Sequence, residues 1–117
     1  MFKKIIFGTV SLMLYTHASE YTAFMAQNHI GEKATVCGKV VSTYYASNSK
    51  GEPTFLNLEE PYPDHIFTVV IWGDERERFG EPETIYKNKH ICITGKIKSY
   101  RGKAEIIAYS PSQISIK

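Results

Sequence analysis

Two segments of the sequence alternate apolar and polar residues and carry a glycine at their centre. The first is Val36-x-Gly38-x-Val40 and the second is Ile93-x-Gly95-x-Ile97. A period of two predicts strands with one buried face, and a glycine in the middle of such a strand marks a bulge or a sharp bend. We therefore expect strands that bend strongly, as those of a small, tightly coiled barrel must.

Three further segments are typical of short strands. Residues 66–72 are the most strand-like by composition, because they are rich in β-branched and aromatic residues. A short helix capped by Ser19 or Thr22 and ended by Gly31 is expected before the first strand. The predicted fold class is therefore all-β with short helices. We predict five strands, at residues 34–43, 54–58, 66–72, 91–98 and 104–109, joined by a polar loop at 44–53, a turn at 61–64, a short helix or irregular crossover at 73–89 and a hairpin turn at 100–103.

The first 18 residues have the order of a secretory signal peptide. Lys3 and Lys4 precede an uncharged, mostly apolar run at residues 5–15, and Ala18 offers a small residue before a cut. The run is shorter than the roughly 18 apolar residues that a membrane span needs; a retained anchor is the alternative. We expect residues 1–18 to be removed on export and residues 19–117 to remain as one periplasmic or secreted domain, without stable membrane insertion.

Charge and motif content limit the classes of function. Two of the 14 basic residues are Lys3 and Lys4, which leaves 12 against 12 acidic residues, and the last part of the chain, from Lys87 onward, is the basic part. Affinity for nucleic acid grows with the number of phosphates neutralised, so we expect any such affinity to be modest and salt-sensitive. We find no catalytic grouping, no metal-ligand spacing among the four histidines and no glycine-rich phosphate loop. We expect neither an enzyme nor a cofactor.

The order of these segments resembles OB-fold domains of the nucleic-acid-binding type. These include small extracytoplasmic bacterial domains, some of which are found beside nucleases. The resemblance covers roughly residues 31–114 and implies a five-stranded, closed Greek-key barrel, which the short helix expected before residue 31 would precede. It is carried by Val36-x-Gly38-x-Val40, Phe55-Leu56-Asn57-Leu58, residues 67–71 and Ile93-x-Gly95-x-Ile97-x-x-Tyr100-x-Gly102-x-x-Glu105-Ile106.

The chain has two cysteines, Cys37 and Cys92. An even number of cysteines in an exported chain indicates a disulfide. The resemblance makes the first and fourth strands antiparallel neighbours, with both thiols on the same outward face, so a bridge is feasible where the registers match. The alternative is two unpaired thiols that act as small packing residues. The expected export favours the bridge.

The resemblance also suggests a binding site. In this fold, the loops after strands one and four flank the surface that binds nucleic acid. Tyrosines there can stack on bases, an asparagine can bind a base edge or sugar, and cations can bind phosphates. In the alternative, this is plain surface where the tyrosines cover the barrel mouth. We expect Phe55 and Phe67 in the core rather than at the binding surface, and Trp72 half-buried in the core or at its rim, since large aromatic side chains usually bury most of their area. The candidate residues are Tyr44, Tyr45, Asn48 and Lys50 after strand one, Lys98, Tyr100, Arg101 and Lys103 around the second loop, and Trp72 at the end of strand three.

The sequence thus predicts an exported OB-fold module that contacts single-stranded DNA or RNA through these two loops. The alternative is a protein-interaction or structural module of the cell envelope that does not bind nucleic acid. A third hypothesis is an oligosaccharide or small-ligand binder that uses the same groove.

Overall fold

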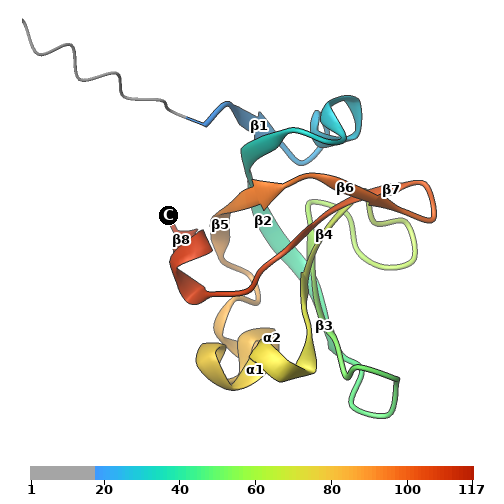
Figure 1. Cartoon of the computed structure of the whole chain (residues 1–117), viewed down its shortest axis with the longest axis vertical. Coiled ribbons are helices and arrows are strands. Elements are labelled where there is room, and N and C mark those ends of the chain that lie inside the picture. Colours follow the sequence, from blue (N-terminus) through green and yellow to red (C-terminus); the bar gives the residue numbers. More distant parts are fainter. Residues whose placement is uncertain (1–17) are drawn as a thin grey trace, which may run out of the picture.

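The computed structural model describes residues 18–117 (Figure 1). The expected signal peptide lies outside the described residues, apart from Ala18. Strands dominate, as the sequence predicted, and the helices are short. The elements are β1 (Glu20–Thr22), η1 (Ala26–His29), β2 (Lys33–Tyr45), β3 (Thr54–Leu58), β4 (Phe67–Ile71), α1 (Gly73–Phe79), α2 (Pro82–Ile85), β5 (His90–Lys96), β6 (Lys98–Tyr100), β7 (Lys103–Ile107), η2 (Pro111–Gln113) and β8 (Ile114–Ile116).

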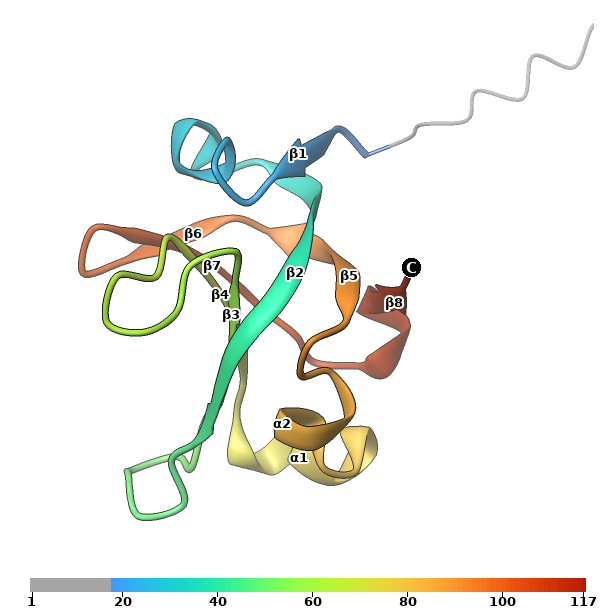
Figure 2. The ribbon, with the colours of Figure 1, turned by 180° about the vertical axis from the view of Figure 1, so that it is seen from behind.

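The strands form one sheet in the order β6-β7-β4-β3-β2-β5-β8, with β1 paired to β2. β5 and β6 stand toward opposite ends of this order, although only Ile97 separates them in the chain. β5 pairs with β2, and β6 pairs with β7 (Figures 1 and 2). β5 also approaches β7 closely, because a Cβ added to Gly95 would lie 2.7 Å from Cγ2 of Ile106. One stretch of chain thus joins β6, at one end of the order, to β5, which is next to the other end.

The concave side of the sheet holds the apolar core. Alternate residues of each strand point inward, and removing each large apolar side chain from water stabilises the fold by roughly 1.5–3 kcal/mol. The alternation predicted for the first and fourth strands is confirmed. The largest fully buried side chains are those of Val36, Val40, Thr54, Leu56, Leu58, Phe67, Val69, Ile71, Ile91, Ile93, Ile97 and Ile106.

The bend in β2 lies a little beyond the position that the sequence indicated. The register with β3 shifts between Val40 and Ser42, rather than at Gly38. The missing side chain of Gly38 makes room for Glu59, whose Oε1 would lie 2.9 Å from an added Cβ. That oxygen accepts a hydrogen bond from the backbone N–H of Lys39, at 2.8 Å. Gly38 thus admits a side chain that binds a backbone group beside the bend.

The described residues form eight strands where five were expected, and several predicted boundaries differ from the structure. The helix expected before the first strand is a parallel strand, β1, followed by the 3-10 helix η1, because β1 pairs with β2 and the N–H of Thr35 donates to the carbonyl of Ser19. The loop expected from residue 44 begins after Tyr45, since β2 continues to pair with β3 there. The crossover at 73–89 contains α1 and α2. None of the helices in residues 18–117 is both long and apolar enough to cross a membrane.

The predicted disulfide is confirmed. Cys37 on β2 and Cys92 on β5 are direct cross-strand partners, and their sulfur atoms are bonded at 2.03 Å. The bridge joins two strands that are 55 residues apart in the sequence. It therefore fixes the pairing that connects the two halves of the chain.

Replacing both cysteines, Cys37→Ala with Cys92→Ala, is expected to lower the free energy of unfolding by about 4 kcal/mol. The chain-entropy model gives this value for a closed loop of 55 residues, because the bridge restricts the unfolded chain. Urea unfolding followed by the fluorescence of Trp72 measures it. Wild type in a thiol reductant should lose about the same stability, whereas the double variant should not respond to reductant. An unchanged unfolding midpoint in the double variant would contradict this account.

Candidate functional site

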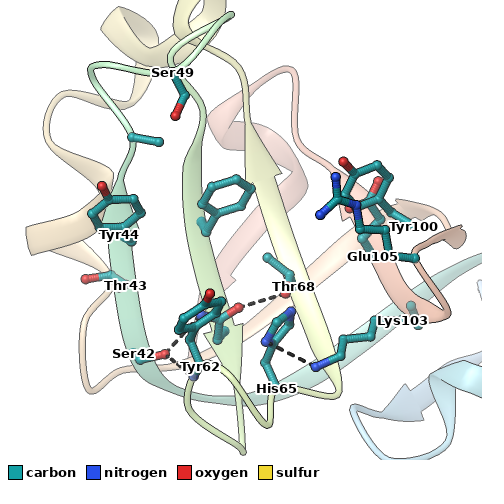
Figure 3. Close-up of a pocket in the computed structure, with 15 residues that line it drawn as sticks. Ser42, Thr43, Tyr44, Ser49, Tyr62, His65, Thr68, Tyr100, Lys103 and Glu105 are labelled. Atoms are coloured by element: carbon teal, nitrogen blue, oxygen red, sulfur yellow. Dashed lines mark hydrogen bonds between the residues drawn. The ribbon is translucent and has the colours of Figure 1, made fainter.

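A groove of about 940 Å³ lies on the outer face of the sheet (Figure 3). This volume lies within the range of ligand-binding clefts. Outer strand residues form its floor, and the loop at 46–53, the turn at 59–66 and the hairpin at 100–103 rise around it. The lining residues are Ser42, Thr43, Tyr44, Ala46, Ser49, Phe55, Asn57, Tyr62, His65, Thr68, Tyr100, Arg101, Lys103, Ala104 and Glu105.

The strand registers place five polar residues in one row across the floor. Ser42 on β2 pairs with Asn57 on β3, Asn57 with Thr68 on β4, Thr68 with Glu105 on β7, and Glu105 with Lys98 on β6. Directly paired residues point to the same face of a sheet. The row therefore runs from one wall of the groove to the other.

Hydrogen bonds fix one half of this row. The hydroxyl of Thr68 donates to Oδ1 of Asn57 at 2.7 Å, and Nδ2 of Asn57 donates to Oγ of Ser42 at 3.0 Å. The backbone N–H of Tyr62 also donates to Oγ of Ser42, at 3.3 Å, which attaches the 59–66 turn to the floor (Figure 3). Because buried polar groups are stable only when they are paired, this network gives the floor one defined shape.

Aromatic side chains stand around the floor. Tyr44 is 64% exposed and pairs across the strands with Phe55, which is half-buried. Tyr62 is 74% exposed on the turn, and Tyr100 is 59% exposed on the far side. The interpretation of Phe55 as a core residue is wrong, because Phe55 alternates with the buried Leu56 and Leu58 and lines the groove on the opposite face. Phe67 is fully buried, as predicted.

The hairpin at 100–103 supplies the cations. Arg101 and Gly102 have positive φ angles of 50° and 78°, as expected for the tight turn between β6 and β7. The guanidinium of Arg101 lies 5.3 Å from the ring centroid of Tyr100. Nζ of Lys103 donates to the carbonyl oxygen of Pro63 at 2.7 Å, which ties the hairpin to the 59–66 turn. One cation therefore shapes the groove, while Arg101 remains exposed.

Two titratable groups of the groove have shifted pKa values. Burial, and then the charge of Lys103, lowers the pKa of His65, whose Nδ1 lies 3.5 Å from Nζ of Lys103. Burial raises the pKa of Glu105, although the charge of Lys98 opposes this shift. The groove thus favours a neutral imidazole and weakens the ionisation of its one lining carboxylate.

The structure brings four of the predicted binding residues together, namely Tyr44, Tyr100, Arg101 and Lys103. Lys98 is exposed at the end of the floor row.

The other four predicted residues do not line the groove. Tyr45 faces away, with the guanidinium of Arg76 3.8 Å from its ring centroid. Asn48 and Lys50 are exposed on the loop at 46–53, of which Ser49 reaches the groove. Trp72 is 41% exposed and lies against Gly51, at the start of α1.

Several lining residues were missed by the sequence analysis. Tyr62 stands between two prolines, a pattern that keeps a tyrosine in a turn, and its ring stacks on His65 with centroids 5.5 Å apart. Ser42, Asn57 and Thr68 are polar residues at alternate positions of strongly apolar strands, which is a detectable sign of a polar outer row.

The acidic and sulfur groups near the disulfide do not form a metal site. A carboxylate oxygen of Glu20 and the sulfur atoms of Cys37 and Cys92 lie within 4.8 Å of one another. Metals bind the thiolate form of cysteine, and the disulfide leaves neither sulfur in that form.

Two solved structures are similar to this chain in fold. One is provisionally assigned as an aspartyl-tRNA synthetase from Leishmania major Friedlin, with a TM-score of 0.59 and 12% sequence identity; the match covers 92% of this chain and 22% of that one. The other is the OBody AM1L10 bound to hen egg-white lysozyme, with a TM-score of 0.57 and 20% identity over 89% of this chain and 97% of that one. No protein-family model and no curated protein matches the sequence. At these identities the likeness concerns the fold alone.

Replacing Glu105 by glutamine is expected to raise the free energy of unfolding relative to wild type, and to do so more near pH 7 than at acidic pH. Because burial raises the folded-state pKa of Glu105, the wild type loses stability as pH rises from the unfolded-state pKa through the folded-state pKa. Glu105→Gln removes this loss. Urea unfolding of both proteins at about pH 3.5 and about pH 7 measures the difference.

The same comparison with Glu77→Gln, which removes an exposed carboxylate on α1, controls for net charge. If the free energies of unfolding of Glu105→Gln and wild type change in parallel between the two pH values, the loss of stability does not come from Glu105, and the prediction is refuted.

Proposed function

We propose that the described residues form an OB-fold barrel that binds single-stranded nucleic acid in the groove. In this proposal β5 and β6 count as one strand that bends at Ile97, and β2, β3, β4 and β7 are the other four. The pairing of β5 with β2 and of β6 with β7 supports closure of the sheet. The close approach of Gly95 to Ile106 supports it further.

We also propose that the protein is exported to the periplasm or secreted. The disulfide between Cys37 and Cys92 supports this, because disulfides persist in oxidising compartments. The charged and apolar order of residues 1–18 agrees with it.

The ring of aromatic side chains around a rigid polar floor carries the proposal of nucleic-acid binding. Proteins that bind single strands stack bases on aromatic rings and contact the backbone with cations. Here Tyr44, Phe55 and Tyr100 line the groove, and Arg101 is exposed beside Tyr100. These rings are large enough to stack on bases, and the cations lie at one edge, where a phosphate backbone would pass.

The charge of the groove implies that stacking contributes more than phosphate contacts. Lys98, Arg101 and Lys103 are the cations at its edge, and Lys103 already donates to Pro63. Glu105 lines the same groove and opposes them. We therefore expect modest affinity and little binding to duplex DNA, whose bases are not available for stacking.

The second candidate function is protein binding in the cell envelope. The OBody, whose chain is matched over 97% of its length, is bound to lysozyme, a protein. Exposed tyrosines are common at protein interfaces. The experiment below separates the two functions, because only a nucleic-acid-binding groove retains an oligonucleotide.

Replacing Tyr44 or Tyr100 by alanine is expected to weaken binding of a fluorescent single-stranded oligonucleotide. Each stacked base contributes about 1–3 kcal/mol, so the Kd should rise about 5- to 150-fold for each variant. Fluorescence anisotropy at low salt measures the Kd. Tyr109→Ala is the matched control, since Tyr109 is an exposed tyrosine outside the groove, and it should bind as wild type does. Absence of binding by wild type at low salt would favour the protein-binding module.

The salt dependence of binding should be shallow. Single strands give a slope of log K against log salt of about −0.7 for each phosphate neutralised. Two or three cations therefore predict a slope between about −1.4 and about −2.1. Arg101→Ala should reduce the slope, whereas Lys87→Ala, which removes an exposed cation away from the groove, should not. A slope steeper than about −4 would show that a wider basic surface binds the ligand.

A further inference from the structure

The polar floor of the groove differs between its two halves. Asn57, Thr68 and Ser42 satisfy one another with hydrogen bonds. The side chain of Glu105, next in the row, makes no hydrogen bond or ion pair with any residue of 18–117. Lys98 is its cross-strand partner and lies toward the edge. Of the members of the row that line the groove, the one whose side chain lacks a partner within residues 18–117 is therefore a carboxylate, which can only accept hydrogen bonds when it is ionised.

We propose that Glu105 makes the groove select bases that carry an exocyclic amine, namely cytosine, adenine and guanine, over uracil and thymine. This inference rests on the proposed function of the groove. It adds a specificity that stacking alone does not provide, because every base has a face that can stack.

The chemistry of the base edges supports this selection. Cytosine presents an N4 amine, and carboxylates accept hydrogen bonds from that amine. Uracil and thymine present the O4 oxygen at the same position, which would meet Glu105 acceptor to acceptor. A base that covers the floor would remove water from the carboxylate of Glu105, and an acceptor that is then left unpaired costs free energy.

The position of Glu105 suits this role. It lies beside Thr68 in the row (Figure 3). Its strand, β7, lies between β4 and β6. β3, the other neighbour of β4, carries Phe55, and β6 carries Tyr100. A base stacked on one of these rings would direct its edge toward the floor. Asn57 and Thr68 are held by their mutual hydrogen bond, so the carboxylate of Glu105 is the group on the floor that can accept a hydrogen bond from that edge.

The test compares two oligonucleotides that differ little except at this edge. Oligo-deoxycytidine and oligo-deoxyuridine of equal length, about eight nucleotides, are bound to wild type and to Glu105→Gln at about pH 8, well above the usual carboxyl pKa. Wild type should bind the cytidine strand about tenfold more tightly or better. Glu105→Gln should bring the ratio of the two Kd values near one, because an amide can both donate and accept.

The ratio, rather than either Kd, is the readout, because removing a negative charge tightens binding of both strands. Glu77→Gln should leave the ratio unchanged. If wild type binds both strands equally well, the selection by Glu105 is refuted while the proposed function stands. If wild type binds neither strand, the proposed function fails, and the inference fails with it. A wild-type preference that survives in Glu105→Gln would assign the selection to another residue and overturn the inference.

Discussion

The fold depends on the length and bend of β2. This strand of 13 residues pairs with β1 and β5 along its first half and with β3 along its second. A flat strand could not serve both sets of partners, because the sheet must turn between them. The register shift after Val40 makes that turn, and the space at Gly38 lets Glu59 bind the backbone beside it. The disulfide then holds the first half of β2 on β5.

The same bend creates the groove. After the shift, Ser42 and Tyr44 face outward, whereas Thr43 donates to the carbonyl of Glu83 and Tyr45 packs under Arg76. The outer faces of β3 and β4 are covered by the turns around them, so Thr68 and Asn57 are buried although they lie outside the core. Burial makes their hydrogen bonds matter, because an unpaired partner there would cost about 1–3 kcal/mol. The half of the floor around Asn57 and Thr68 therefore has one defined shape before any ligand arrives.

Much of the fold could be predicted from the sequence, and less of the site. Alternation located the main strands and turned Cys37 and Cys92 outward, because inward and outward positions follow from a period of two, and the resemblance to OB-fold domains made their strands neighbours. The side that Tyr44 and Tyr45 face could not be predicted, since a single bulge residue reverses the alternation. Tyr62 and His65 belong to a turn whose path depends on contacts with Ser42 and Lys103, which are distant in the sequence. Phe55 was misjudged because its exposure depends on the loops that surround the groove, and local sequence patterns do not reveal where those loops lie.

The balance of charges in the groove limits what it can bind well. If phosphate contacts dominated, a carboxylate on the floor would oppose the ligand, and Lys103 would point toward solvent instead of donating to Pro63. A groove that keeps Glu105 among aromatic rings instead favours ligands with flat faces and hydrogen-bond donors at their edges. Nucleobases meet both conditions, whereas the carboxylates of an acidic peptide are acceptors only. If the proposed function holds, contacts to bases would therefore contribute most, with the backbone held only at the edge where Arg101 lies.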